Sequence, residues 1–241
     1  MARAPESLRV VEIAGSRAGS VAARLLADLG ASVTRILPHD ASLDDTADTD
    51  PAAAAHEAWL RTGRTTEVVD LETHEGVRAL REHLARADVS IESAAPGPLR
   101  PRPEPAEQAG LVRVLVSPLG TSGPLAGLRS NDFTDEAAAG HLLLNGEPGR
   151  PPIARPGRLA SYQAGLHAVI GALAALRERA TAGRGRTVEV AHVEGLVALH
   201  QHTITMWTHD RHVLHRQGNR QPGYWHPTGV YACRDGHVAL N

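Results

Sequence analysis

The chain has 241 residues, enough for one or two domains with a substantial hydrophobic core. Its 25 basic residues nearly balance 27 acidic ones, and a net charge of -2 argues against a general nucleic-acid-binding or membrane-surface protein. All basic residues are arginine, which excludes a lysine nucleophile, and the single Cys233 excludes an internal disulfide framework or a cysteine-based zinc site.

Neither a signal peptide nor a membrane span is expected. The first residues, MARAPESLRVVEIAG, lack the apolar stretch of a secretory signal. The longest apolar run, residues 164–176, is interrupted by His167 and is too short to cross a bilayer. We therefore expect a soluble, cytoplasmic protein. The Ala- and Arg-rich composition is typical of a GC-rich bacterial gene.

The first half of the chain alternates strands and helices. The helix expected at residues 18–29 places apolar residues at helical spacing and ends at Gly30. A strand–helix–strand unit this short indicates a parallel sheet. An acidic, Ala-rich loop is expected at residues 39–55 and a proline-rich connection at 96–105. The expected strands are residues 9–14, 32–37, 67–71, 89–92 and 111–116, and a second helix runs from Thr73 to Ala87.

The second half has a different character. Helices are expected at residues 132–144, 159–180 and 193–209, with a short β-prone segment at 187–190. Residues 217–227 form a glycine-containing loop, and residues 229–240 read as a hairpin that turns at Arg234 and Asp235. The chain stops inside a strand-like run, which suggests a fragment or a shortened relative of a longer protein.

Several local patterns resemble parts of known functional sites, but for each a purely structural explanation is favoured. Residues 15–19, GSRAG, lack the full GxGxxG dinucleotide fingerprint, so a tight turn is favoured over NAD binding. His209, His212 and His215 have the spacing to share a helical face, but neighbouring arginines favour a solvated helix end over a metal site. The sequence contains no Gly-x-Ser-x-Gly motif, so a standard serine hydrolase is not supported.

Six segments together resemble one known family. Residues 9–38 contain LLADLGA, residues 68–97 begin VVDLETHEG, and residues 111–128 contain SPLGTSG. Further segments are GEPGRPPIARPG at 146–157, the stretch 165–195 with TAGRGRTVEV, and residues 216–240 with QGNRQPG. In this order they resemble the family III CoA-transferases, which include formyl-CoA and carnitine CoA-transferases and α-methylacyl-CoA racemases.

The resemblance implies an α/β fold: a Rossmann-like parallel sheet with helices on both faces, followed by a smaller domain. Residues 1–228 would form the large domain, and residues 229–241 a strand pair leading toward a small domain that is missing. It also implies an interlocked dimer, no metal, and an aspartate that attacks the acyl-CoA thioester. That attack gives an acyl anhydride and then an aspartyl-CoA thioester.

The sequence departs from the family pattern at this aspartate. Alignment on Gly165 places Ser161 there, and a serine cannot form the anhydride. In the racemases a histidine moves the α-proton, and its position is held by Asn131, beside Asp132. Ser161, Asp132 and Asn131 are therefore the candidate catalytic residues. The alternative is a non-catalytic homologue, or a pseudo-enzyme subunit that needs a partner.

The positions expected to contact coenzyme A are also altered. Glu72 stands where relatives often have lysine, and Ser93 and Ala94 replace an Asn-Phe pair whose ring could stack on adenine. Arg64, Arg61 and Arg129 offer guanidinium groups for phosphate. The candidate coenzyme A positions are Ser16, Arg17, Ala18, Arg64, Val69, Glu72, Ser93, Ala94, Arg129, Gly218 and Gly223. Coenzyme A or acyl-CoA would enter as substrate, in a homodimer or a heteromer with a related chain.

Overall fold

The computed structural model describes residues 8–13, 15–38, 51–93, 109–219 and 227–240. The chain divides into two compact units. One unit comprises Met1–Arg129 and Ser161–His192, and the other Ser130–Ala160 and Val193–Asn241. The domain limits expected from the sequence, 1–228 and 229–241, stay a prediction.

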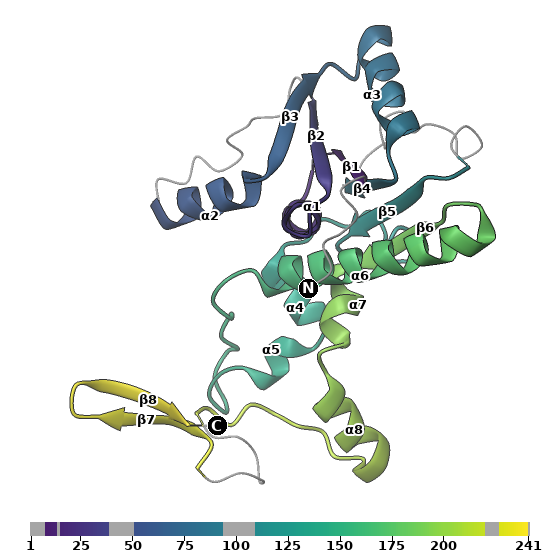
Figure 1. Cartoon of the computed structure of the whole chain (residues 1–241). Coiled ribbons are helices and arrows are strands. Elements are labelled where there is room, and N and C mark those ends of the chain that lie inside the picture. The colour runs from purple at the N-terminus through teal and green to yellow at the C-terminus, as the bar shows by residue number, and fades with distance from the viewer. Residues whose placement is uncertain (1–7, 14, 39–50, 94–108, 220–226, 241) are drawn as a thin grey trace. The chain divides into compact units, whose positions relative to one another are not determined.

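The first unit is built on a six-stranded parallel sheet with the order β3-β2-β1-β4-β5-β6 (Figure 1). The strands are β1 (Arg9–Ile13), β2 (Ser32–Pro38), β3 (Arg64–Val69), β4 (Val89–Ser93), β5 (Val112–Ser117) and β6 (Thr187–Ala191). The chain moves outward from β1 to β3 and then returns to place β4 on the other side of β1. In a doubly wound sheet this reversal is the point where ligands bind, beyond the carboxyl ends of the strands.

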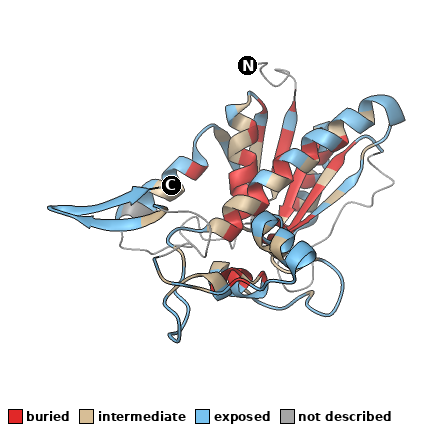
Figure 2. Ribbon diagram, turned by 90° about the horizontal axis from the view of Figure 1, so that it is seen from below, coloured by how far each residue is buried: buried red, intermediate tan, exposed pale blue. Residues whose placement is uncertain are grey.

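Helices cover both faces of this sheet, which confirms the expected fold class. They are α1 (Arg17–Asp28) and α6 (Leu159–Ala182) on one face and α3 (His74–Arg86) on the other, while α2 (Pro51–Arg61) contacts α1. Alternate residues of β1 point to opposite faces. Val10 joins the core formed with α1 and α6, whereas Val11 joins the core formed with α3. Buried residues accordingly concentrate in the strands and on the inner faces of these helices (Figure 2).

Local sequence explains where the first helices begin. Ser16 and Thr73 are the N-caps of α1 and α3, and each side chain accepts a hydrogen bond from a backbone amide in the first turn. The strand expected at 67–71 lies earlier, at Arg64–Val69. The loop expected to reach residue 55 was too long, because Pro51 starts α2 and alanines follow it. Proline suits the first helical position, and alanine has the highest helix propensity.

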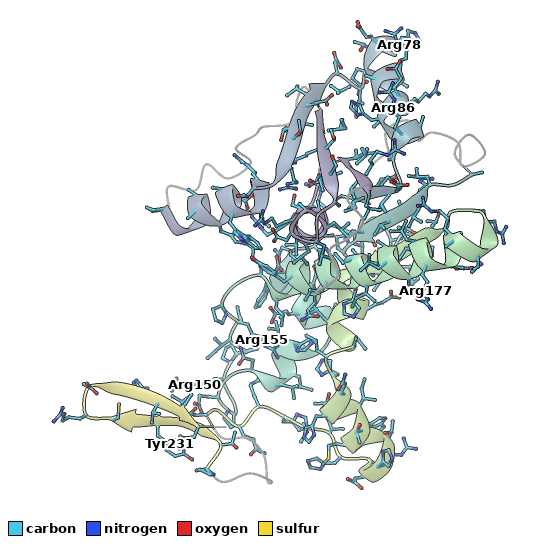
Figure 3. The ribbon with its side chains drawn as sticks, in the orientation of Figure 1. Arg78, Arg86, Arg150, Arg155, Arg177 and Tyr231 are labelled. Carbon is cyan, nitrogen blue, oxygen red and sulfur yellow. The ribbon has the colours of Figure 1, made fainter. Side chains whose placement is uncertain are left out.

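The long apolar helix expected at residues 159–180 is present as α6, which ends two residues later than predicted. Within the described residues, α6 is the one helix whose 24-residue length and apolar composition would allow it to cross a membrane. Its Ala164, Ala168 and Ala172 pack into the core that α1 forms on the sheet. Its exposed face includes Ile170 and, near the end of the helix, Arg177 (Figure 3).

The second unit contains short helices and a hairpin: α4 (Asp132–Ala138), α5 (His141–Leu144), α7 (His192–Val197, whose first residue belongs to the first unit), α8 (Gln201–Asp210), β7 (Gly229–Cys233) and β8 (Gly236–Leu240). Ala139, Ala160 and Leu196 form a small core here. The antiparallel pairing of β7 and β8 confirms the expected hairpin, and its strands are largely exposed (Figure 2).

Two helices that the sequence predicted as single are each divided. Gly140, with φ of 86°, separates α4 from α5, a backbone conformation that glycine adopts without strain. His200 separates α7 from α8. Helix α8 ends at Asp210, and Arg211 has a left-handed φ of 55°. His212 and His215 therefore lie beyond the helix and do not share a helical face with His209.

Candidate functional site

The carboxyl ends of β1 and β4 place two serines together at the reversal point of the sheet. Ser93, the last residue of β4, donates a hydrogen bond from Oγ to Ser16 Oγ at 2.7 Å. Ser16 Oγ in turn accepts from the Gly19 amide at 3.1 Å. A Cβ added to Gly19 would lie 3.2 Å from Ser93 Oγ, so glycine permits this close approach. The backbone amides at the start of α1 and these hydroxyls form a potential anion site.

Arg17, the first residue of α1, is held by an acid from another helix. Its Nη2 and Nε donate to Glu57 Oε1 at 2.7 and 3.2 Å. Helix α2, which carries Glu57, lies beside α1 (Figure 1). Burial raises the pKa of Glu57, but the hydrogen bond and charge of Arg17 outweigh it and leave the pKa below its usual value. Glu57 is therefore an ionised carboxylate at neutral pH.

The first turn of α6 lies at the same edge of the sheet. The connection from β5 to β6 is a parallel crossover, so α6 runs antiparallel to the strands and begins near their carboxyl ends. Contact with α1 is close: a Cβ added to Gly165 would lie 2.9 Å from Ala18 O. Ser161 is one helical turn earlier and is buried, with 4% of its surface exposed.

A ring cluster joins α2 to this turn of α6. His56 Nε2 is hydrogen-bonded to the Tyr162 hydroxyl. Trp59 stacks beside both rings, with centroids 6.0 Å from His56 and 6.5 Å from Tyr162. Burial raises the pKa of Tyr162; the charge of Arg17 lowers it, and that of Glu57 raises it. Arg17, Glu57 and Tyr162 therefore lie close enough for their charges to interact.

Arg64, expected to meet a phosphate, has a different set of contacts here. Its side chain is 1% exposed, pairs with Glu12, and donates to Leu60 O. Ser20 Oγ also donates to Glu12, at 2.7 Å. For Arg64 to bind phosphate, this buried pair would have to open.

The remaining expected coenzyme A positions are divided among several environments. Ala18 and Val69 are buried, while Glu72 and Arg129 are exposed. All four belong to the first unit, as do Ser16, Arg17, Arg64 and Ser93. Gly218, in the second unit, has φ of 65°. Ala94 and Gly223 lie outside the described residues.

Asn131 and Asp132 belong to the second unit and begin α4. Asn131 is the N-cap: its side chain accepts from the Thr134 amide at 3.0 Å, and Thr134 Oγ1 accepts from the Asn131 amide at 2.8 Å. This reciprocal capping box gives Asn131 a structural role. Asp132 is half-buried in the first helical turn, where a carboxylate interacts favourably with the helix dipole.

The second unit holds a cavity of about 490 Å³ whose lining includes histidines and Arg155 together with leucine, threonine, glycine and amide residues. The rings of His141 and His200 stack with centroids 4.0 Å apart. Arg155, on the segment between α5 and α6, donates to His141 Nδ1 at 2.9 Å (Figure 3). Within the described ranges, no cluster of three or more His, Cys, Asp or Glu residues is arranged to hold a metal.

The His141 contacts predict acid sensitivity. Nε2 must donate to the Leu196 carbonyl, and Nδ1 must accept from Arg155, so the folded protein holds the neutral ring. Burial lowers the pKa of His141; the Leu196 hydrogen bond opposes this, and the nearby His200 and Arg155 charges lower it further. The unfolded chain takes up the proton near pH 6.5, before the folded chain does, so stability is lost as pH falls below that value.

We expect the free energy of unfolding in urea to fall between about pH 7 and pH 5, by at most about 1.4 kcal/mol per pH unit for this group. His141→Gln should reduce that slope, whereas His237→Gln, at an exposed position on β8, should leave it unchanged. Equal slopes for wild type and His141→Gln would contradict the assignment of a neutral ring.

Sequence reasoning missed Glu57, His56 and Tyr162 as candidate site residues. Two of them fell at the edge of a segment expected to be a loop. For His56 and Glu57, the sequence does carry a local indication. The run from Pro51 to Arg61 begins with proline and continues with alanines, a pattern that favours a helix. Its contacts with Arg17 and Tyr162 cross 40 and 106 residues of chain, and no local pattern encodes them.

Comparisons with known proteins agree with this fold and chain order. Residues 6–241 match the family model of CoA-transferase family III. The chain is 28% identical to succinyl-CoA–D-citramalate CoA-transferase of Chloroflexus aurantiacus, covering 96% of this chain and 59% of that protein. It is 30% identical to subunit BbsE of succinyl-CoA:(R)-benzylsuccinate CoA-transferase of Thauera aromatica, covering 96% and 58%.

A solved structure shows the same architecture. A CAIB/BAIF family protein from Brucella suis superposes with a TM-score of 0.86 at 27% identity, covering 98% of this chain and 65% of that one. The chain thus spans about three fifths of the length of the curated relatives it matches.

Proposed function

The chain belongs to CoA-transferase family III, and from that premise we propose that it binds an acyl-CoA and transfers coenzyme A between carboxylic acids. The observation that carries this proposal is the paired hydroxyls of Ser16 and Ser93, at the start of α1 and at the reversal point of the sheet. Hydroxyls and helix N-terminal amides are donors that suit the phosphates of coenzyme A. Coenzyme A enters as a substrate, with no tightly bound cofactor.

Each element of the site has a defined task in this proposal. The first turn of α1 binds phosphate, while Arg129, exposed in the same unit, supplies further positive charge. The first turn of α6, with Ser161 and Tyr162, lies at the same edge of the sheet and faces the reacting thioester.

We further propose that the protein works in the cytoplasm as a homodimer or as a heteromer with a related chain. The heteromer is supported by relatives that are themselves named as subunits, including the alpha and beta subunits of succinyl-CoA–L-malate CoA-transferase of Chloroflexus aurantiacus. Of these, the alpha subunit is 32% identical to this chain over 201 residues.

A second candidate function rests on Ser161, which is buried and which alignment on Gly165 assigns to the position of the family aspartate. In this alternative the chain is a non-catalytic homologue, or a subunit that binds acyl-CoA and relies on a partner for the reacting carboxylate. An isolated chain that binds coenzyme A but does not move it from an acyl-CoA to a carboxylic acid would support this alternative.

Calorimetric titration with coenzyme A tests the binding site. We expect one-site saturation, and stabilisation of the fold by about 2.7 kcal/mol at a hundredfold excess over Kd. Ser93→Glu places a negative charge beside Ser16 and should weaken binding by at least about tenfold, or 1.4 kcal/mol. Ser32→Glu adds the same charge at an exposed position where β2 begins, and should bind like wild type. Absence of heat in a folded chain, or equal loss in both variants, would refute this site.

A further inference from the structure

We propose that Glu57 is the carboxylate nucleophile of this chain, in place of the aspartate that family resemblance would put at Ser161. The inference rests on the proposed transferase function and assigns its reacting group. It arises from contacts between residues of α1, α2 and α6 that all belong to the first unit.

Ser161 does not supply the required chemistry. Its hydroxyl needs a neighbouring base to become a nucleophile, and the acyl ester it would form is much lower in free energy than a thioester. Coenzyme A would not readily reclaim an acyl group from such an ester. A carboxylate instead forms an anhydride, which keeps the acyl group activated. The reaction therefore needs a carboxylate near the first turn of α6.

Glu57 meets this requirement by position. It is anchored to Arg17, the first residue of α1, and its neighbour His56 is hydrogen-bonded to Tyr162, which directly follows Ser161. Helix α2 thus carries the acid to the edge of the sheet where α1 and α6 begin. The charge of Glu57 also affects the pKa of Tyr162, which is consistent with their proximity.

Glu57 is also in a suitable state to react. Both hydrogen bonds from Arg17 end on Oε1, and Oε2 accepts none from the residues that the structure describes. The side chain is 22% exposed, so a substrate can reach it. The Arg17 guanidinium keeps the carboxylate ionised and fixes its orientation, as a reacting group requires.

The step balances without any other reactant. Glu57 Oε2 attacks the thioester carbonyl carbon, the C–S bond breaks, and the coenzyme A thiolate leaves from a mixed anhydride. The thiolate then attacks the Glu57 carbonyl carbon, which releases the first carboxylate and leaves a glutamyl-CoA thioester. The acceptor carboxylate attacks that thioester, and the returning thiolate converts the second anhydride to the new acyl-CoA and free Glu57.

The experiment compares wild type, Glu57→Gln and Glu57→Asp in transfer from succinyl-CoA to a carboxylic acid. Hydroxylamine is added to trap the enzyme thioester, and peptide mass spectrometry locates the hydroxamate. Glu57→Gln should lose transfer by on the order of a thousandfold or more and give no adduct at residue 57. Glu57→Asp retains a carboxylate on a side chain that is one methylene shorter. It should still form the adduct, about a hundredfold more slowly, because the reacting oxygen is moved from its position. Glu82→Gln, at an exposed position on α3, should stay within about twofold of wild type.

The outcomes separate this inference from the function on which it rests. A hydroxamate on Glu57, together with loss of transfer in a Glu57→Gln variant that still binds coenzyme A, supports the assignment. Transfer by Glu57→Gln, or a hydroxamate on another carboxylate such as Asp132, overturns it and leaves the transferase function standing. A wild-type chain that binds coenzyme A without transfer or adduct overturns the catalytic function, and Glu57 with it.

Discussion

Replacement of Glu12 by alanine should destabilise the fold by about 3–5 kcal/mol, because it leaves a buried guanidinium without its counter-ion. The Glu12 side chain is 2% exposed and the Arg64 side chain 1%. Glu12 also accepts from Ser20 at 2.7 Å, and Arg35 Nε lies 3.7 Å from its carboxylate. Without the carboxylate, these polar groups stay buried in the centre of the sheet with no acceptor at that position.

The measurement is the free energy of unfolding in urea, followed by circular dichroism. Glu67→Ala is the matched control, since it removes an acid of strand β3, which also carries Arg64; the Glu67 side chain is 45% exposed and pairs with His83. Exposed pairs of this kind contribute about 0–1 kcal/mol. Similar losses for the two variants would mean that the Glu12–Arg64 pair is not held away from water in solution.

Gly185→Ala is the second variant with a large expected effect, a loss of about 3 kcal/mol from steric overlap with the backbone. A Cβ at this position would lie 1.9 Å from the Leu111 carbonyl oxygen and 2.4 Å from its carbon. The Gly185 amide donates to Ala109 O at 2.7 Å, and the Arg113 amide donates to Arg186 O at 2.8 Å. The methyl group can fit only if β6 shifts away from β5, which would break these hydrogen bonds.

Thermal or urea unfolding of the Gly185→Ala variant, compared with that of a separate Gly110→Ala variant, tests this expectation. Gly110 lies in the same pair of segments, but a Cβ there would meet nothing within 4 Å. Alanine at that position should be neutral or stabilising by about 0.4–1 kcal/mol, since it restricts the unfolded chain. If Gly185→Ala is as stable as Gly110→Ala, the close approach of β6 to the Leu111 carbonyl is refuted.

Local sequence predicted the periodic elements well. Alternating strand and helix patterns indicated the parallel sheet, Thr73 marked the start of α3, and the Arg234–Asp235 turn marked the hairpin of β7 and β8. These features depend on residues close together in the chain, where capping, glycine conformation and side-chain period act directly. The family also followed from sequence, because six segments in order carried it and the match over residues 6–241 confirmed it.

The points where helices begin and end were harder to predict, as Gly140 and Pro51 illustrate. Gly140 breaks the 132–144 helix through its left-handed backbone, although glycine within a helical pattern is also tolerated at a modest cost. Pro51 starts a helix where composition alone suggested a continuing loop. In both places the same residue type is compatible with two local structures, and packing decides between them.

Sequence by itself determined the family and the parallel α/β sheet, and it predicts that Ser161 replaces the family aspartate. Only the tertiary structure decided how the charged groups pair: Arg17 with Glu57, and Arg64 with Glu12, across 40 and 52 residues. An arginine in a sequence looks equally available to a phosphate or to an acid. Its partner depends on which side chains the fold brings within about 4 Å, where Coulomb attraction and desolvation act.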